Sequence, residues 1–491
     1  MLRAGLRRQL LAIASASLAM VSMGVVLAWS SPAVPKLPHL TAAEASWVGS
    51  LPSLAAALGP WLGGWAADRV GRRATALLGA VPMAGSWVAL MFVEHAPTWL
   101  CVVRFVSGLG IGLIVTSLSM YGAEISQANI RGALLMLQQP SITTGFMLDY
   151  CIGPFVSYTT LAAIGLAVPL LFMVTFFWVP ESPYYLLARG RDEEAESSLR
   201  RLRWDLDKGA VEESKENEAS VLDLFRSRRC RRALVISLGL VCAEQLAGIN
   251  AVLFYSQSIF DAAGGDVDSR VAPIIVNGAM LIESCVTPFL VDRLGRRPML
   301  IFSSTGMSVA LTVLAVYFYL SDTGKNVEDI GWLPLTALVF YIITYTSGYG
   351  GLTATVPAEI FSQNVKSVAL PVATFVSWTM SFLVTRFFED ISSAVGNYGP
   401  FFLFAACSLL ASFHVYFLLP ETKGKTLEEI QVMLESATSD TLILGYRYLL
   451  DQCAPALKYD SMFRNSGERG VNIYPRTTPS SSCDSTTTAA M

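Results

Sequence analysis

Long apolar runs separated by short polar segments dominate the pattern of this chain. Each run reaches about twenty residues, the length that an α-helix needs to cross the hydrocarbon core of a bilayer. Twelve such runs can be marked, and they cover residues 10–31, 46–67, 74–93, 98–120, 133–155, 158–179, 233–257, 271–291, 298–320, 332–356, 367–388 and 398–419. The pattern predicts an all-α membrane protein with twelve transmembrane helices.

The longest polar stretch inside this region separates the sixth run from the seventh and carries dense charges of both signs. We therefore predict four parts. They are a six-helix bundle over 1–180, a cytoplasmic linker with short helices over 181–232, a second six-helix bundle over 233–420, and a cytoplasmic tail over 421–491 that is largely disordered at its end.

The distribution of Lys and Arg orients the predicted helices. If both termini are cytoplasmic, 30 of the 35 basic residues fall on that side and only three fall in the opposite loops. Cytoplasmic loops carry an excess of Lys and Arg. The sequence thus predicts that both termini and the 181–232 linker are cytoplasmic.

Composition narrows the class of protein further. The chain is 53% hydrophobic and only 15% charged, with a mean hydropathy of +0.49, which favours the bilayer as its solvent. The net charge of -3 gives no indication of a nucleic acid partner, and we expect none. The eight Cys have no C-x-x-C spacing and the three His are scattered, so we expect no metal, no cofactor and no enzyme activity.

Three loop motifs occur twice, once in each half of the chain. The matched segments are Asp68–Arg73 with Asp292–Arg297, Glu124–Arg131 with Glu359–Lys366, and Pro180–Pro183 with Pro420–Lys423. Matched spacing in both halves predicts two pseudo-symmetric six-helix bundles that arose by duplication.

Duplicated transporters bind their substrate between the halves and rock one half against the other. The charged loop residues fit this scheme, because ion pairs among them can hold the halves closed on the cytoplasmic side. The candidates are Asp68, Arg72, Glu124, Arg131, Asp292, Arg296, Glu359 and Lys366. The alternative is that these charges serve only to orient the chain in the membrane.

These motifs together resemble the sugar porter family of the major facilitator superfamily over about residues 10–429. Further motifs that carry the resemblance are Arg104 with Gly108, Gly110 and Gly112, and Gln245-Leu-Ala-Gly-Ile-Asn250. The short first external loop and Tyr150-Cys-Ile-Gly-Pro154 resemble the insect facilitated trehalose and glucose transporters. The resemblance implies passage of a sugar by alternating access, a plasma-membrane location and a monomer in membrane lipid.

The resemblance also implies binding residues. Gln139, Gln245 and Asn250 match positions where the family has sugar-binding amides, and Trp378 matches an aromatic position. An amide suits a sugar hydroxyl because both groups donate and accept hydrogen bonds. Gly248 is expected to loosen the helix between Gln245 and Asn250. The alternative for each amide is a hydrogen bond between helices.

Several positions depart from the family pattern. Glu244 replaces the first of the paired glutamines, and Met280 stands where an Asn is usual, with Asn277 and Glu283 one turn to either side. We therefore include Glu244 and Asn277 among the binding candidates. Ser377 replaces an expected Asn, and Ala354 replaces the pocket Trp.

Three functions remain open from the sequence. The first is facilitated diffusion of a hexose or trehalose, favoured because the first run contains no acid over 22–29. The second is proton-coupled sugar symport through the membrane acids Asp149, Glu244 or Glu283. The third is a transporter-like sugar sensor that signals through its tail with little flux.

Overall fold

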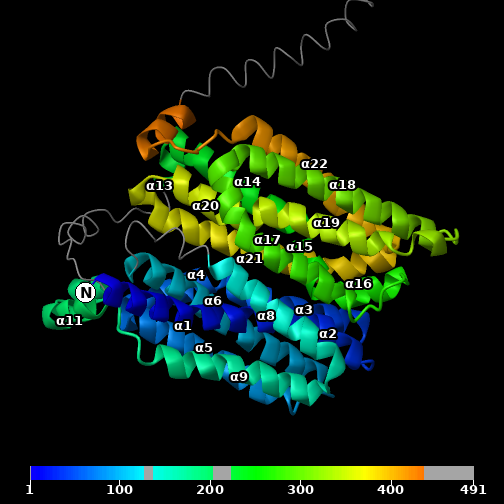
Figure 1. Ribbon diagram of the computed structural model, residues 1–491, viewed down its shortest axis with the longest axis horizontal. Helices are drawn as coiled ribbons and strands as arrows, with labels where there is room; N and C mark the ends of the chain where they lie inside the picture. The colour runs from blue at the N-terminus through cyan, green and yellow to red at the C-terminus, as the bar shows by residue number, and fades with distance from the viewer. Residues whose placement is uncertain (1, 126–136, 203–222, 436–491) are drawn as a thin grey trace, which may run out of the picture. The chain divides into compact units, whose positions relative to one another are not determined.

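The computed structural model describes residues 2–125, 137–202 and 223–435. Within these ranges all regular elements are helices (Figure 1). The described helices belong to one compact unit, which includes both halves of the predicted duplication.

The helices of the first half pack mainly on one another, α5 on α6, α1 on α8, and α3 on α6. Their bounds are α1 Leu2–Ala28, α2 Ser30–Ala33, α3 Ala42–Ala57, α4 Gly59–Val70, α5 Arg72–Leu90, α6 Pro97–Ile125, α8 Gln138–Ile152 and α9 Tyr158–Phe176. Short 3-10 turns follow α2 at Val34–Lys36 and α8 at Gly153–Phe155.

Three helices of the central linker lie within the described residues. They are α10 Pro183–Ala188, α11 Asp192–Leu202 and α13 Asp223–Arg226. The short linker helices implied by the family resemblance are thus present in the part that the structure describes.

The second half contains long helices that again pack among themselves, notably α18 on α22 and on α19. Their bounds are α14 Arg228–Leu246, α15 Ile249–Phe254, α16 Ser256–Ala263, α17 Ala272–Leu294, α18 Arg296–Asp322, α19 Leu333–Ser347, α20 Tyr349–Ile360, α21 Gln363–Val395 and α22 Tyr398–Leu418. A 3-10 turn at Glu328–Ile330 precedes α19.

Among the described residues, nine segments are long and apolar enough to cross a membrane. The other three predicted spans, 46–67, 74–93 and 133–155, correspond to the pair α3 and α4, to α5 and to α8. The α3–α4 span is divided at Leu58, and Pro60 lies in the first turn of α4, which begins at Gly59.

Glycines allow several helices of the first half to pack closely against one another. A Cβ on Gly24 would collide with the backbone of α8 at Ile142 and Gly145, and one on Gly59 would collide with Gly112 of α6. Small residues at these crossings let the backbones approach, which is how membrane helices gain packing without a hydrophobic driving force. The α1–α8 and α4–α6 contacts therefore depend on glycine.

The two halves meet along α3 with α21 and along α8 with α17. Near the start of α3, Ser46 donates to the carbonyl of Arg386 on α21 over 2.6 Å. The Arg386 guanidinium lies 4.9 Å from the centre of the Trp47 ring. These contacts join the halves at the end of α3 and α21 away from the Asp68 and Glu359 loops.

Candidate functional site

The span that carries Gln245 and Asn250 is broken into two helices. Helix α14 ends at Leu246, α15 begins at Ile249, and Gly248 between them has φ +83°. A Cβ at this position would also collide with the Phe404 ring. L-residues with side chains avoid this backbone region, so the expectation that Gly248 loosens the helix is confirmed.

The break brings Gln245 and Asn250 side by side. The Asn250 amide donates to Gln245 Oε1 over 2.6 Å, and Gln245 Nε2 donates to Ser377 Oγ over 3.2 Å. Asn250 also lies 2.9 Å from Ser381 Oγ. Ser377, the residue that replaces the family's Asn, thus accepts a hydrogen bond from the Gln245 amide.

This chain of polar side chains crosses from one half to the other. Ser381 Oγ on α21 donates to Ser53 Oγ on α3 over 3.1 Å. Both serines are buried. Sequence reasoning missed Ser53 and Ser381, because the pairing of α3 with α21 can be seen only in the folded chain.

Gln139 and Trp378 lie outside this polar chain. Gln139 is half-buried in the first turn of α8, and its carbonyl accepts from Thr143 Oγ1 over 3.0 Å. Trp378 is half-buried on α21 and packs against the hydrophobic core. The structure therefore does not join either residue to Gln245 and Asn250.

Asn277 is fully buried where α17 meets α8. Its Nδ2 donates to the Thr143 carbonyl over 3.2 Å, so the amide forms a hydrogen bond between the two halves. Met280, one turn away, is also buried. The Asn277 amide therefore links a helix of one half to a helix of the other.

Glu244 lies on the side of α14 that meets the junction of α19 and α20. The Tyr345 hydroxyl donates to Glu244 Oε1 over 2.9 Å. Glu283 on α17 approaches the same turn of α19, where Ser347 Oγ donates to its Oε1 over 2.7 Å. Two membrane acids therefore hold the last turn of α19.

Asp149 has different surroundings in the first half. Its side chain is fully buried, and neither carboxylate oxygen has a hydrogen-bond partner among the described residues. Arg104 and Lys36 act on it electrostatically. Arg104 itself donates to the Val26 and Val48 carbonyls and lies 4.9 Å from the centre of the Trp29 ring.

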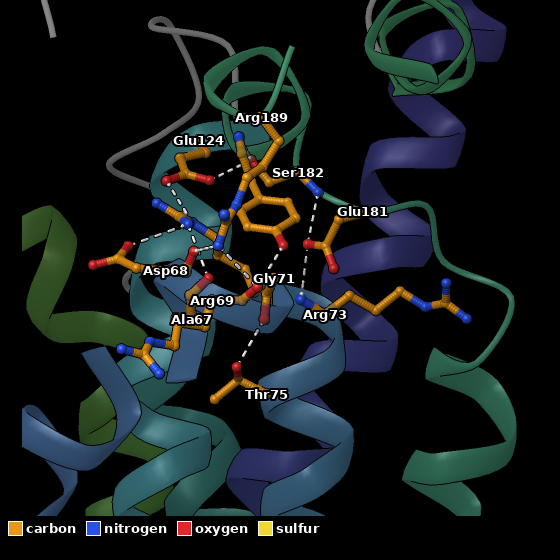
Figure 2. A network of polar contacts seen from close by, with 12 residues as sticks. Ala67, Asp68, Arg69, Gly71, Arg73, Thr75, Glu124, Glu181, Ser182 and Arg189 are labelled. Carbon is orange, nitrogen blue, oxygen red and sulfur yellow. Dashed lines mark hydrogen bonds and ion pairs between the residues drawn. The ribbon is translucent and has the colours of Figure 1, made fainter. Parts of the chain in front are cut away.

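The first loop motif forms a compact network of polar contacts that includes Asp68, Glu124 and Ser182 (Figure 2). The Arg72 guanidinium lies 3.1 Å from Glu124 Oε1 and 3.3 Å from Asp68 Oδ1. Ser182 donates to the other oxygen of Glu124. Glu181 accepts from the Arg73 backbone N–H over 2.9 Å, at the start of α5. The network joins α4, α5, α6 and the beginning of the linker.

The second copy repeats this arrangement in the other half. Arg296 lies 3.1 Å from Glu359 Oε1, and Thr422 donates to Glu359 Oε2 over 2.6 Å. Glu421 accepts from the backbone N–H groups of Arg296 and Arg297, each over 3.0 Å. Burial opposes ionisation of Glu421, but backbone donors, first Lys423 and then Arg296 and Arg297, hold its pKa below the ordinary value.

The remaining loop candidates are placed only in part. Lys366 Nζ donates to the Ala358 carbonyl over 2.9 Å. Arg131 and the side chain of Asp292 lie outside what the structure describes.

The loop ion pairs differ from the sequence expectation in one respect. Among the described residues, the pairs of Arg72 and Arg296 lie within one half each. These pairs tie helices of one bundle together. Glu181, Ser182, Glu421 and Thr422 were not predicted as members, although the duplicated Pro-Glu motif was a signal for them.

The same overall arrangement occurs in solved transporters. A partially occluded, inward-open structure of the xylose transporter XylE from E. coli aligns with a TM-score of 0.72 at 24% identity, covering 86% of this chain and 100% of that one. A XylE structure bound to 6-bromo-6-deoxy-D-glucose, of the major facilitator superfamily, aligns with a TM-score of 0.68. This chain therefore has the twelve-helix major facilitator fold, as predicted.

Relatives in sequence place the chain more narrowly. The facilitated trehalose transporter Tret1 of Polypedilum vanderplanki is 36% identical over 442 residues, which cover 86% of this chain and 87% of that protein. Tret1 of Bombyx mori is 35% identical over 445 residues, covering 88% and 87%. Tret1 of Aedes aegypti is 34% identical over 441 residues, and the aligned part is 86% of this chain but only 54% of that relative.

A family match covers nearly the whole described region. Residues 8–434 match the family described as "Sugar (and other) transporter". The chain belongs to this family, and the resemblance identified from its motifs is confirmed.

Proposed function

We propose that this chain carries a sugar, either a hexose or trehalose, across the plasma membrane by facilitated diffusion. The observation that carries the proposal is the chain of polar side chains from Gln245 and Asn250 through Ser381 to Ser53. It places hydrogen-bonding groups inside a membrane protein, where unpaired polar groups are costly. A sugar hydroxyl can exchange with any of these partners because it both donates and accepts.

Alternating access requires contacts between the halves that can be broken. Those at the start of α3, Ser46 with Arg386 and Arg386 over Trp47, are single polar and aromatic contacts. Arg72 and Arg296 keep each bundle together internally. This combination suits two rigid halves that rock around the polar chain.

The arrangement in the membrane is part of the same proposal. Residues 1–180 and 233–420 form the two bundles, 181–232 link them, and 421–491 form a tail on the same side as the N-terminus. That side is the cytoplasm, and the transporter acts as a monomer. The proposal is supported by the positive-inside distribution of Lys and Arg and by relatives that are transporters and not enzymes.

The test is uptake of labelled glucose and labelled trehalose into cells that express the chain, at two external pH values. Saturable uptake of either sugar that is independent of pH supports a facilitator. If neither sugar enters while the protein is at the surface, the proposal is wrong for these substrates.

Proton-coupled symport is a second candidate, and Asp149 is the observation that favours it. This buried acid has no hydrogen-bond partner among the described residues and lies under the influence of Arg104 and Lys36. Uptake that rises as the external solution is acidified, and that loses this dependence in Asp149→Asn, would favour the symporter. The sensor hypothesis depends on residues 436–491, which lie outside the described part.

A further inference from the structure

Glu244 directly precedes the Gln245–Asn250 motif, and it is half-buried on the side of α14 that meets α19 and α20. Its carboxylate accepts a hydrogen bond from the Tyr345 hydroxyl, and a further hydrogen bond links it to the Thr353 side chain. Its neighbour Gln245 is already part of the polar chain. A solute bound by the amides would therefore lie within one residue of a carboxylate.

Glu244 has no ion-pair partner within 4.0 Å among the described residues, and the same holds for Glu283. Asp149, in contrast, has Arg104 and Lys36 near it. An ionised carboxylate inside a membrane protein is costly unless a positive charge compensates it. A cation supplied by the solute would provide that compensation.

A second source of negative potential lies at the same place. Helix α19 ends at Ser347, and Gly348 breaks the chain before α20. The C-terminal end of a helix carries partial negative charge on its free carbonyls, and such ends bind cations in transporters with broken helices. Tyr345 donates a hydrogen bond to Glu244, and Ser347 donates one to Glu283. Both donors belong to this last turn.

An unused hydroxyl completes the surroundings. The Tyr349 side chain is fully buried, and its hydroxyl has no hydrogen-bond partner among the described residues. It lies close enough to Glu244 for the two to interact electrostatically. Tyr341 also acts on Glu244, but its hydroxyl donates to the Ala247 carbonyl. The titratable His414 on α22 also contacts α14, but its ring lies against the carbonyl of Ile236, which precedes Glu244 by eight residues.

We propose that Glu244, together with Tyr345 and Tyr349, binds a protonated amino group on the transported solute, so that this chain prefers amino sugars to neutral sugars. The proposal rests on the proposed sugar transport. The ammonium would donate to Glu244 and to the free Tyr349 oxygen, while the sugar hydroxyls meet Gln245 and Asn250. A carboxylate accepts where the amide of the family pattern both donates and accepts, and this difference selects for a donor.

The test compares uptake of labelled glucosamine, glucose and N-acetylglucosamine into cells that express the chain. The pH is set below the usual pKa range of an amino group, so that the amine of glucosamine is protonated. The Glu244→Gln variant keeps the size of the side chain and removes its charge. We expect glucosamine to be preferred, and its uptake relative to glucose to fall about tenfold or more in the variant. Glu94→Gln, which removes an acid in the loop between α5 and α6, should leave the ratio unchanged.

Tyr349→Phe is the second variant, because it removes a hydroxyl without breaking a described hydrogen bond. It should lower the uptake of glucosamine relative to that of glucose, compared at matched surface amounts. If glucose enters but glucosamine is not preferred, or if Glu244→Gln leaves the ratio unchanged, the amine proposal is wrong and sugar transport stands. Glucose uptake that rises in acid and loses this response in Glu244→Gln would assign the carboxylate to a proton and also overturn the proposal. Entry of none of the three sugars would overturn sugar transport itself.

Discussion

Asn250 donates its side-chain amide to Gln245 Oε1 over 2.6 Å, although a glycine in the left-handed region separates their helices. The two residues form one hydrogen-bonding unit inside the membrane. Each is therefore the partner that fixes the orientation of the other.

The first prediction concerns this unit. Gln245→Ala or Asn250→Ala should lower the apparent affinity for the transported sugar by about tenfold to a hundredfold. The reason is that the loss of one partner leaves a buried polar group unsatisfied. The measurement is the concentration dependence of sugar uptake at matched surface amounts. Asn326→Ala, which removes an amide from the loop between α18 and α19, is the control. Equal kinetics in all three variants would contradict a binding role.

The second prediction concerns the break at Gly248. Gly248→Ala should destabilise the protein by more than the roughly 1–2 kcal/mol of the left-handed conformation alone, because its Cβ also collides with the Phe404 ring. Gly264 is a matched control, with φ +58° and open space around its Cβ position. Thermal unfolding of the purified variants in detergent measures the difference. If Gly264→Ala is as destabilising as Gly248→Ala, the contact with Phe404 is unimportant.

The third prediction concerns the duplicated loop networks. Arg72→Ala and Arg296→Ala should each lower the free energy of unfolding by about 1–3 kcal/mol, since each leaves a half-buried carboxylate without its charged donor. Arg69→Ala changes an exposed arginine of the same motif and should cost much less. Thermal unfolding and surface amount are the readouts. Unchanged stability with altered transport would instead support contacts between the halves.

The fourth prediction concerns pH. The pKa of Glu421 is lowered in the folded protein, so its stabilising effect is present above the unfolded value of about 4.3 and is lost as pH falls through the folded pKa. The stability gap between the unmodified chain and Glu421→Gln should therefore narrow in acid. Glu428→Gln alters an exposed acid nearby and should show no such gap at neutral pH. A gap that is constant with pH would contradict this assignment.

The membrane spans could be predicted from the sequence because a helix must be apolar for its whole length in lipid. The break at Gly248 was predictable for a similar local reason, since glycine alone adopts its backbone conformation without strain. The division at Leu58 was not expected, because the apolar run continues across it.

For the site, the sequence indicates individual residues but not the contacts between them. The sequence indicates Gln245 and Asn250, but Ser53 and Ser381 follow from the packing of α3 against α21. Asn277 was a binding candidate from the sequence, and its bond to the Thr143 carbonyl of α8 became visible only in the fold. The sequence indicated that loop charges can form ion pairs, whereas the partners of Arg72 and Arg296, and the half to which each pair belongs, required the fold.

Glu181 and Glu421 each accept backbone N–H groups at the start of a helix within their own half. Each half therefore stabilises its own loops and helix starts through contacts within that half. One consequence is that the covalent link between the halves is dispensable for the internal architecture of either. Two separate polypeptides, divided between Leu202 and Asp223 and produced in the same cell, should each fold and then associate into a working carrier.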